Sequence, residues 1–324
     1  RQYKTGSRKA LTGAEEKMIE TSHGTVAVAD TNIGAKSIVF IHGNSSCKEI
    51  FTHQFRYFSE QYRIVAIDLP GHGVSFNARP EEDYSVQSYA RMVADVVKEL
   101  DLVEPVIFGW SLGGYVALEY AAAGYPLSAL SISGTSPVSV FPDDMPKGYI
   151  PSPHMELAGK RFHSRYEKQR YALHTVGTDE PEAKMFRDAV WRTDGRAREY
   201  VFSKLKTIDW PRQTRLLQKG DIPFAMLNGP EDPFINHNYC QSLSYGNIWT
   251  GNVISIEGDR LVWAVMYGDT ADGSWFFGLI KDGTDISQMR ETLIFGPAYQ
   301  GGASADPLSA VAALPRDAEI CGCN

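Results

Sequence analysis

The sequence predicts an α/β fold with a mostly parallel central sheet, helices on both faces of the sheet and an inserted helical cap. Short apolar runs at residues 37–42 and 63–68 suit strands that are buried on both faces. Helical stretches alternate with such runs, which implies right-handed crossovers between parallel strands. Between residues 137 and 218 the alternation stops and only helical patterns remain, which indicates the cap.

The individual elements follow in chain order. "TVAVAD" (25–30) is typical of a first strand, and Ser85 is a plausible N-cap for an amphipathic helix over 85–100. Apolar residues recur in that helix at steps of three and four. The remaining core elements are the strand "VIFGW" (106–110), the helix "LGGYVALEYAAA" (112–123), the strand "LSALSISG" (127–134) and the strands at 223–229 and 252–258.

These patterns divide the chain into five segments. Residues 1–17 lack periodicity and resemble a non-native leader before Met18. The ranges 18–136 and 219–258 form the two parts of the α/β core, and 137–218 forms the helical cap. Residues 259–324 are a divergent tail with Gly- and Ala-rich patches. Its runs "RLVWAVMY" (260–267) and "SWFFGLI" (274–280) are candidate strands, and the structure of the tail is otherwise unknown.

Composition narrows the class of protein. The chain is 43% hydrophobic and 22% charged, which is ordinary for a globular protein. Its net charge of −7 argues against nucleic acid as a partner and against steering to anionic lipid. No apolar run reaches the roughly 18 residues of a membrane helix. The cysteines favour a reducing cytoplasm because they are few and scattered, at Cys47, Cys240, Cys321 and Cys323.

The segment "GWSLGG" (109–114) lies between a predicted strand and a predicted helix. Gly-x-Ser-x-Gly in that setting is typical of a nucleophile elbow, a tight turn that raises a serine hydroxyl above the sheet. Ser111 is therefore the candidate nucleophile. The N–H of Leu112 begins the helix, where it can meet a developing oxyanion. The alternative is a structural turn.

Two histidine-containing turns follow the first core strands. "FIHGNSS" (40–46) ends a strand, and the backbone N–H of Asn44 is the candidate for the second oxyanion donor. The alternative is a simple turn with Gly43 at positive φ. "DLPGHG" (68–73) is a sharp turn in which we expect His72 to be structural.

The acid of the site should follow the nucleophile along the chain, at the end of a later strand. "AMLNGPEDPF" (225–234) fits, and Asp232 is the candidate that would orient a histidine and stabilise its charged form. Glu231 is the neighbouring alternative. A solvated turn acid is the structural alternative.

Together, "HGN", "DLPGHG", "GWSLGG", the helical cap and "NGPEDPF" resemble the α/β-hydrolase family over roughly residues 20–258. Within it, "TSHGTVAV", "IHGNSS", "GWSLGG", "RTDGRAR" and the acid before "PF" resemble the metal-independent N-acyl-homoserine lactonases of the AidH type. The resemblance implies a small-molecule lactone or acyl ester as substrate, quorum quenching as the role, and no metal or organic cofactor. Ser111 would attack the lactone carbonyl, and the Asn44 and Leu112 N–H groups would hold the oxyanion.

The residues also exclude some relatives. Haloalkane dehalogenases and epoxide hydrolases of this fold carry aspartate at the elbow, where this chain has Ser111. Zinc-dependent lactonases carry an H-x-H-x-D-H cluster, which is absent from the sequence. A carboxylesterase acting on small acyl esters is the alternative enzyme.

The resemblance ends before the histidine that the family places after its last core strand. No histidine occurs from Asn238 to Asn324, so the catalytic histidine is unknown. Serine without a base is a poor nucleophile. Three explanations are open: the tail comes from a shifted reading frame or fused gene, the protein binds a ligand without turnover, or another group replaces the base. The candidate replacements are His237 and the cap histidines His154, His163 and His174.

Aromatic side chains of the cap are candidates for an acyl-chain pocket. They are Phe162, Tyr166, Tyr171 and Trp191. Of these we expect Tyr171 and Trp191 to contact substrate, together with Trp110 beside the elbow serine. The alternative is that they only pack the cap onto the sheet.

Overall fold

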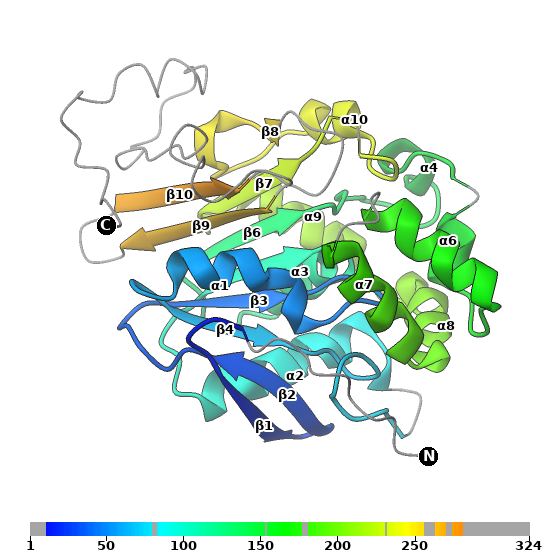
Figure 1. Cartoon of the computed structure of the whole chain (residues 1–324). Helices are drawn as coiled ribbons and strands as arrows, with labels where there is room; N and C mark the ends of the chain where they lie inside the picture. Colours follow the sequence, from blue (N-terminus) through cyan, green and yellow to red (C-terminus); the bar gives the residue numbers. More distant parts are fainter. Residues whose placement is uncertain are drawn as a thin grey trace.

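The computed structural model of the chain describes residues 11–79, 83–152, 154–176, 181–230, 232–255, 263–269 and 274–280. Its strands are β1 (Glu15–Thr21), β2 (Gly24–Asp30), β3 (Ser37–Ile41), β4 (Arg63–Ile67), β5 (Val106–Trp110), β6 (Ala129–Ser133), β7 (Phe224–Asn228), β8 (Ile254–Ser255), β9 (Trp263–Asp269) and β10 (Ser274–Ile280). Strands β1 to β8 form one sheet in the order β1-β2-β4-β3-β5-β6-β7-β8 (Figure 1). The first two pairings are antiparallel and the rest are parallel, which confirms the predicted fold class.

Helices surround this sheet. They are α1 (Thr52–Phe58), α2 (Val86–Glu99), α3 (Leu112–Ala122), α4 (Met145–Gly148), α5 (Met155–Ala158), α6 (Arg165–Val176), α7 (Pro181–Arg192), α8 (Gly195–Ser203), α9 (Trp210–Lys219) and α10 (His237–Ser242). Short 3-10 helices lie at Lys48–Phe51, Leu205–Thr207 and Trp249–Gly251. Among the helices of the described residues, none has a stretch of the length and apolarity that crossing a bilayer requires.

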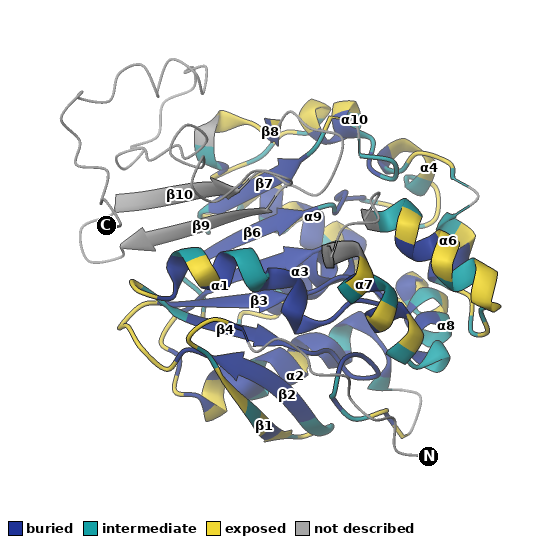
Figure 2. Cartoon of the chain, in the orientation of Figure 1, coloured by how far each residue is buried: buried dark blue, intermediate teal, exposed yellow. Residues whose placement is uncertain are grey.

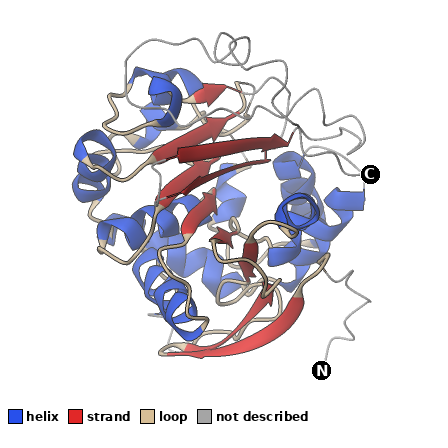
Figure 3. Ribbon diagram, turned by 90° about the vertical axis from the view of Figure 1, so that its left-hand side faces the viewer, coloured by secondary structure: helices blue, strands red, loops and turns tan. Residues whose placement is uncertain are grey.

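The sheet separates two apolar cores because side chains alternate along each strand. In β3, Val39 and Ile41 pack into the core shared with α2 and α3, whereas Ile38 and Phe40 pack into the core shared with α1. Helices therefore cover both faces of the sheet (Figure 3). The central strands are buried along their whole length, as predicted from their unbroken apolar runs (Figure 2).

Helix α2 begins where the sequence predicts. The Ser85 hydroxyl accepts a 3.1 Å hydrogen bond from the Ser88 N–H, which caps the first turn. Its apolar stripe is buried against α3 and the sheet.

The expected boundary after residue 17 falls inside β1, so this expectation needs correction. Residues 15–17 pair with β2, and the Lys17 ammonium lies 2.8 Å from the buried Asp30 carboxylate. Leu11 is buried in the core on the α1 side of the sheet. The fold thus uses residues assigned to the leader.

The segment between β6 and β7 contains α4 to α9. Helices α4, α6, α7 and α8 gather at one end of the sheet, whereas α9 packs against α3 over one face of it (Figure 1). In the tail, β9 and β10 pair antiparallel as a separate two-stranded sheet. The carboxyl ends of β3, β5 and β7 all meet the cap, which is where an open α/β sheet places its ligand site.

Candidate active site

Ser111 occupies a strained turn between β5 and α3, with φ 54° and ψ −117°. A positive φ is costly for a residue other than glycine, so neighbouring bonds must hold it. The Ser111 N–H donates to the Ser133 carbonyl at 2.8 Å, and the Thr135 hydroxyl donates to the Ser111 carbonyl at 2.9 Å. The turn therefore raises the serine side chain above the end of the strand.

The glycines around Ser111 allow α3 to start directly against the sheet. A Cβ on Gly113 would lie 2.1 Å from the Ile41 carbonyl oxygen of β3. A Cβ on Gly109 would lie 2.1 Å from the Gly113 carbonyl oxygen. Both distances are impossible for a carbon atom, so the Gly-x-Ser-x-Gly spacing is a packing requirement.

The loop after β3 passes beside the elbow. A Cβ on Gly43 would lie 3.1 Å from the Ser111 Cβ, and Asn44 lines the same pocket as Ser111 and Leu112. In the described part of the chain, the N–H groups of Asn44 and Leu112 have no protein acceptor. Two unpaired donors beside a serine hydroxyl are the arrangement that an oxyanion requires. The residue with positive φ is Ser45, at 58°, and not Gly43.

Two buried histidines hold this loop to the turn after β4. The His42 Nδ1 bonds the Gly43 carbonyl at 2.7 Å, and its Nε2 accepts from the Leu69 N–H at 3.0 Å. His72 Nε2 accepts from the Ser45 N–H at 3.1 Å. Burial lowers the pKa of both rings, that of His72 to about 3. Both are neutral supports of the loop, which is the structural role expected for His72.

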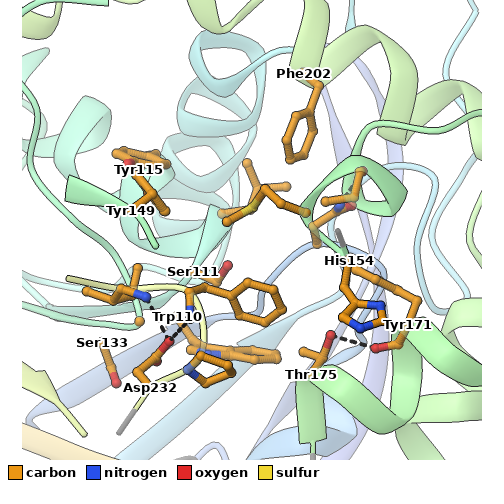
Figure 4. A pocket seen from close by; sticks show the side chains of 18 of the residues that line it. Trp110, Ser111, Tyr115, Ser133, Tyr149, His154, Tyr171, Thr175, Phe202 and Asp232 are labelled. Atoms are coloured by element: carbon orange, nitrogen blue, oxygen red, sulfur yellow. Dashed lines mark hydrogen bonds between the residues drawn. The ribbon is translucent and has the colours of Figure 1, made fainter. Parts of the chain in front are cut away.

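Asp232 follows β7 and lines the pocket together with Ser111 (Figure 4). Its Oδ1 accepts from the N–H groups of Phe234 at 2.8 Å and Ile235 at 2.9 Å. Burial raises the pKa of this carboxyl, and the two backbone bonds oppose that rise. Glu231, the alternative acid, lies outside the described residues.

The pocket has one polar wall and a larger apolar one. Tyr171 and Trp110, two of the expected substrate contacts, line it (Figure 4). The apolar wall comes largely from residues that are not among the candidates from the sequence: Tyr115, Met145, Tyr149, Met155, Val201, Phe202, Leu205, Pro233, Phe234 and Ile235. Tyr115, four residues after Ser111 on α3, could have been found from helical spacing alone.

The structure does not place Trp191 in the pocket. Its side chain on α7 is 47% exposed, and the Lys168 ammonium lies 4.6 Å from the ring centroid. Phe162 and Tyr166 are also exposed, at 77% and 64%. None of these three aromatics lines the pocket.

All eight histidines lie within the described residues, and one of them, His154, lines the pocket. Its ring contacts that of His174 in a tilted arrangement, with 3.8 Å between centroids and 40° between the ring planes. His163 lies outside the pocket and bonds the Leu157 carbonyl at 2.7 Å. His237 is buried outside the pocket, and neither of its ring nitrogens has a partner among the described residues. No histidine hydrogen-bonds to Ser111 or Asp232 in this part of the chain.

Comparison with known proteins agrees with the fold described above. A family model described as the alpha/beta hydrolase family matches residues 38–255. A solved structure of a serine-to-glycine mutant of the N-acyl homoserine lactonase AidH, complexed with N-hexanoyl homoserine lactone, is 34% identical with a TM-score of 0.70. That match covers 75% of this chain and 89% of the lactonase.

Curated relatives match over shorter stretches. The pimeloyl-[acyl-carrier protein] methyl ester esterase of Neisseria meningitidis serogroup C is 27% identical over 205 residues, which is 61% of this chain and 75% of the esterase. An uncharacterized Mycobacterium tuberculosis protein is 35% identical over 85 residues, so the chain matches only 24% of that relative's length and 26% of its own. With the family model matching well over half of it, the chain belongs to the alpha/beta hydrolase family.

Proposed function

We propose that this protein is a serine hydrolase that opens the lactone ring of N-acyl-homoserine lactones, and that Ser111 is the nucleophile. The observation that carries the proposal is the strained Ser111 turn, which lies in one pocket with Asn44, Leu112 and Asp232. The 34% identity to the lactonase AidH supports a lactone as substrate. The buried thiol of Cys240 agrees with action in the cytoplasm.

The proposed reaction has two steps. The Ser111 Oγ attacks the lactone carbonyl, and the N–H groups of Asn44 and Leu112 donate to the oxyanion of the tetrahedral intermediate. The general base takes the proton of the Ser111 hydroxyl and gives it to the ring oxygen as the ring C–O bond breaks, so that this oxygen becomes the hydroxyl of the homoserine part. Water then attacks the resulting serine ester, which returns Ser111 and releases an N-acyl-homoserine carboxylate.

The pocket chemistry suits an acyl chain attached to a polar head. Its apolar wall, which includes Val201, Phe202 and Leu205, can bury methylene groups. Each buried methylene contributes about 0.8 kcal/mol. Tyr171 and Thr175 contribute polar atoms to the pocket. The Thr175 hydroxyl donates to the Tyr171 carbonyl at 2.8 Å and keeps its lone pairs for the N–H of an amide.

The general base cannot be the histidine that the family places after its last core strand, because no histidine occurs from Asn238 to Asn324. His154 is the histidine that lines the pocket, so it is the first residue to test as the base. It lies on the cap beside Arg170, whose guanidinium nitrogen is 3.4 Å from its Nε2. Burial and that cation lower the pKa of His154, which favours its neutral imidazole. A neutral imidazole is the form that can accept a proton.

The test follows hexanoyl-homoserine lactone by mass spectrometry, since ring opening adds the mass of one water. We expect turnover by the wild-type protein and none by Ser111→Ala. His154→Gln should abolish turnover if His154 is the base. Equal conversion by wild type and Ser111→Ala would refute the proposed nucleophile. Preference for p-nitrophenyl butyrate over the lactone would identify a carboxylesterase.

One observation favours a second candidate, a protein that binds its ligand without turnover. In the described residues no histidine bonds Ser111 or Asp232. Calorimetry with the lactone separates the two candidates. Binding with no ring opening, unchanged in Ser111→Ala, would identify the binding protein.

A further inference from the structure

Arg198 of cap helix α8 is a buried cation, 2% exposed, and has no ion pair within the described residues. Its guanidinium donates to two cap carbonyls, that of Lys160 at 2.9 Å and that of Arg161 at 3.2 Å. Its third contact is the Ser45 hydroxyl, 3.5 Å away. Burying a charge without an opposite charge is costly, so the contacts of this side chain need a reason.

The residue that Arg198 reaches is the strained neighbour of the proposed oxyanion donor. Ser45 has φ 58° and follows Asn44 directly. On the core side, the Ser45 N–H is held by His72 at 3.1 Å. On the cap side, the Asn44 side-chain amide donates to the Ala158 carbonyl at 2.7 Å. The Asn44–Ser45 loop is therefore clamped between core and cap, and Arg198 forms part of the cap side of the clamp.

We propose that Arg198 is a positioning residue that fixes the backbone N–H of Asn44 where the oxyanion develops. The assignment rests on the proposed hydrolase function. Arg198 acts through Ser45, because its rigid planar fork ties the Ser45 hydroxyl to two carbonyls of the cap backbone. The "RTDGRAR" segment (192–198) thereby links the cap to the geometry of the site. A donor displaced by about 1 Å lowers the rate on the order of 10²-fold.

The competing role is an anchor that only keeps the cap attached. The two roles predict different results when substitutions of Arg198 and Ser45 are combined in one protein. If Arg198 acts through Ser45, then Arg198→Met and Ser45→Ala remove the same support and their effects do not add. An anchor would lower thermal stability and leave the chemistry unchanged.

The kinetic experiment is a double-mutant cycle on lactone ring opening. We expect Arg198→Met to lower kcat by about 10- to 100-fold and to change KM by less than about threefold. The double variant should be no slower than the slower single variant. Arg161→Met is the matched control, because its side chain is a half-exposed cap cation paired with Glu199. The proposal is wrong if the reductions in kcat of the two single variants multiply in the double variant, or if Arg198→Met leaves kcat unchanged.

A second readout does not depend on turnover. Amide hydrogen exchange of the Ser45 N–H in the full chain reports the clamp directly, since His72 protects that group. We expect exchange at least about 10-fold faster in Arg198→Met and unchanged in Arg161→Met. If wild type shows no turnover, the proposed function fails, and exchange alone decides the role of Arg198. Unchanged Ser45 exchange refutes it. Arg198→Lys, which keeps the charge and loses the fork, replaces Arg198→Met if the latter does not fold.

Discussion

The side-chain amide of Asn44 donates a 2.7 Å hydrogen bond to the carbonyl of Ala158 in the cap. The contact joins the loop after β3 to a helix more than a hundred residues later in the chain. The residue proposed to bind the oxyanion through its backbone thus also holds the cap through its side chain.

Asn44→Ala should destabilise the fold by about 1–3 kcal/mol, because the Ala158 carbonyl loses its donor in a buried position. Urea unfolding measures this change. Asn247→Ala is the matched control, since its amide also donates to a backbone carbonyl, that of Asp221, but at the surface. Equal losses in the two variants would contradict the buried role of Asn44.

Stability should fall in acid because of His72. Burial lowers the folded-state pKa of this ring to about 3, against about 6.5 in the unfolded chain. The unfolded state therefore binds more protons below pH 6.5, and stability is lost as pH falls from 6.5 toward 3. The slope from this group approaches about 1.4 kcal/mol per pH unit.

Urea unfolding between pH 7 and pH 4 tests this slope. His72→Gln removes the titrating ring, so its stability should depend less on pH than that of the wild type. Identical pH profiles would show that His72 is not the source. His163, whose pKa burial lowers to about 4, should contribute over a narrower range, between pH 6.5 and about 4.

Gly113→Ala should prevent correct folding or cost several kcal/mol, because its Cβ would collide with the Ile41 carbonyl oxygen. Soluble yield and thermal unfolding measure the effect. Gly124→Ala is the control: its φ is 80°, but nothing lies within 4 Å of the added carbon. It should cost only about 1 kcal/mol. A well-folded Gly113→Ala protein would contradict the close packing of α3 on β3.

The KM for substrate should depend on residues that line the pocket, and not on aromatic residues that lie outside it. Phe202→Ala should raise KM for hexanoyl-homoserine lactone by about tenfold, because Phe202 lines the apolar wall. Trp191→Ala should change KM by less than about twofold, since Trp191 is half exposed outside the pocket. Initial rates at varied lactone concentration measure both. A larger effect in Trp191→Ala would place substrate on the outer face of the cap.

Local sequence signals predict the core of the fold well. Strand β5 spans Val106–Trp110 as expected, and Ser85 caps α2 as expected, because buried parallel strands and capped helices have strong local patterns. Strand β1 was missed. It pairs antiparallel at the edge of the sheet. One face of such a strand is exposed to solvent and can carry charged residues such as Glu16.

The sequence also predicts only part of the candidate site. Ser111 and Asp232 are found from turns that directly follow strands, and both line the pocket. The sequence gives no reason to choose between the aromatic residues Tyr171 and Trp191, yet only Tyr171 is buried. That choice depends on how the cap helices pack against each other and the core. Arg198 could not be found either, because its partner Ser45 is distant in sequence.

The central claim, that Ser111 is an activated nucleophile, is tested most directly by a fluorophosphonate probe and intact-mass spectrometry. The account predicts one adduct on the wild-type protein, mapped to Ser111 by peptide sequencing and absent from Ser111→Ala. Folding of both proteins is checked by circular dichroism. A folded wild-type protein that gains no adduct, or one labelled equally in Ser111→Ala, would contradict the account.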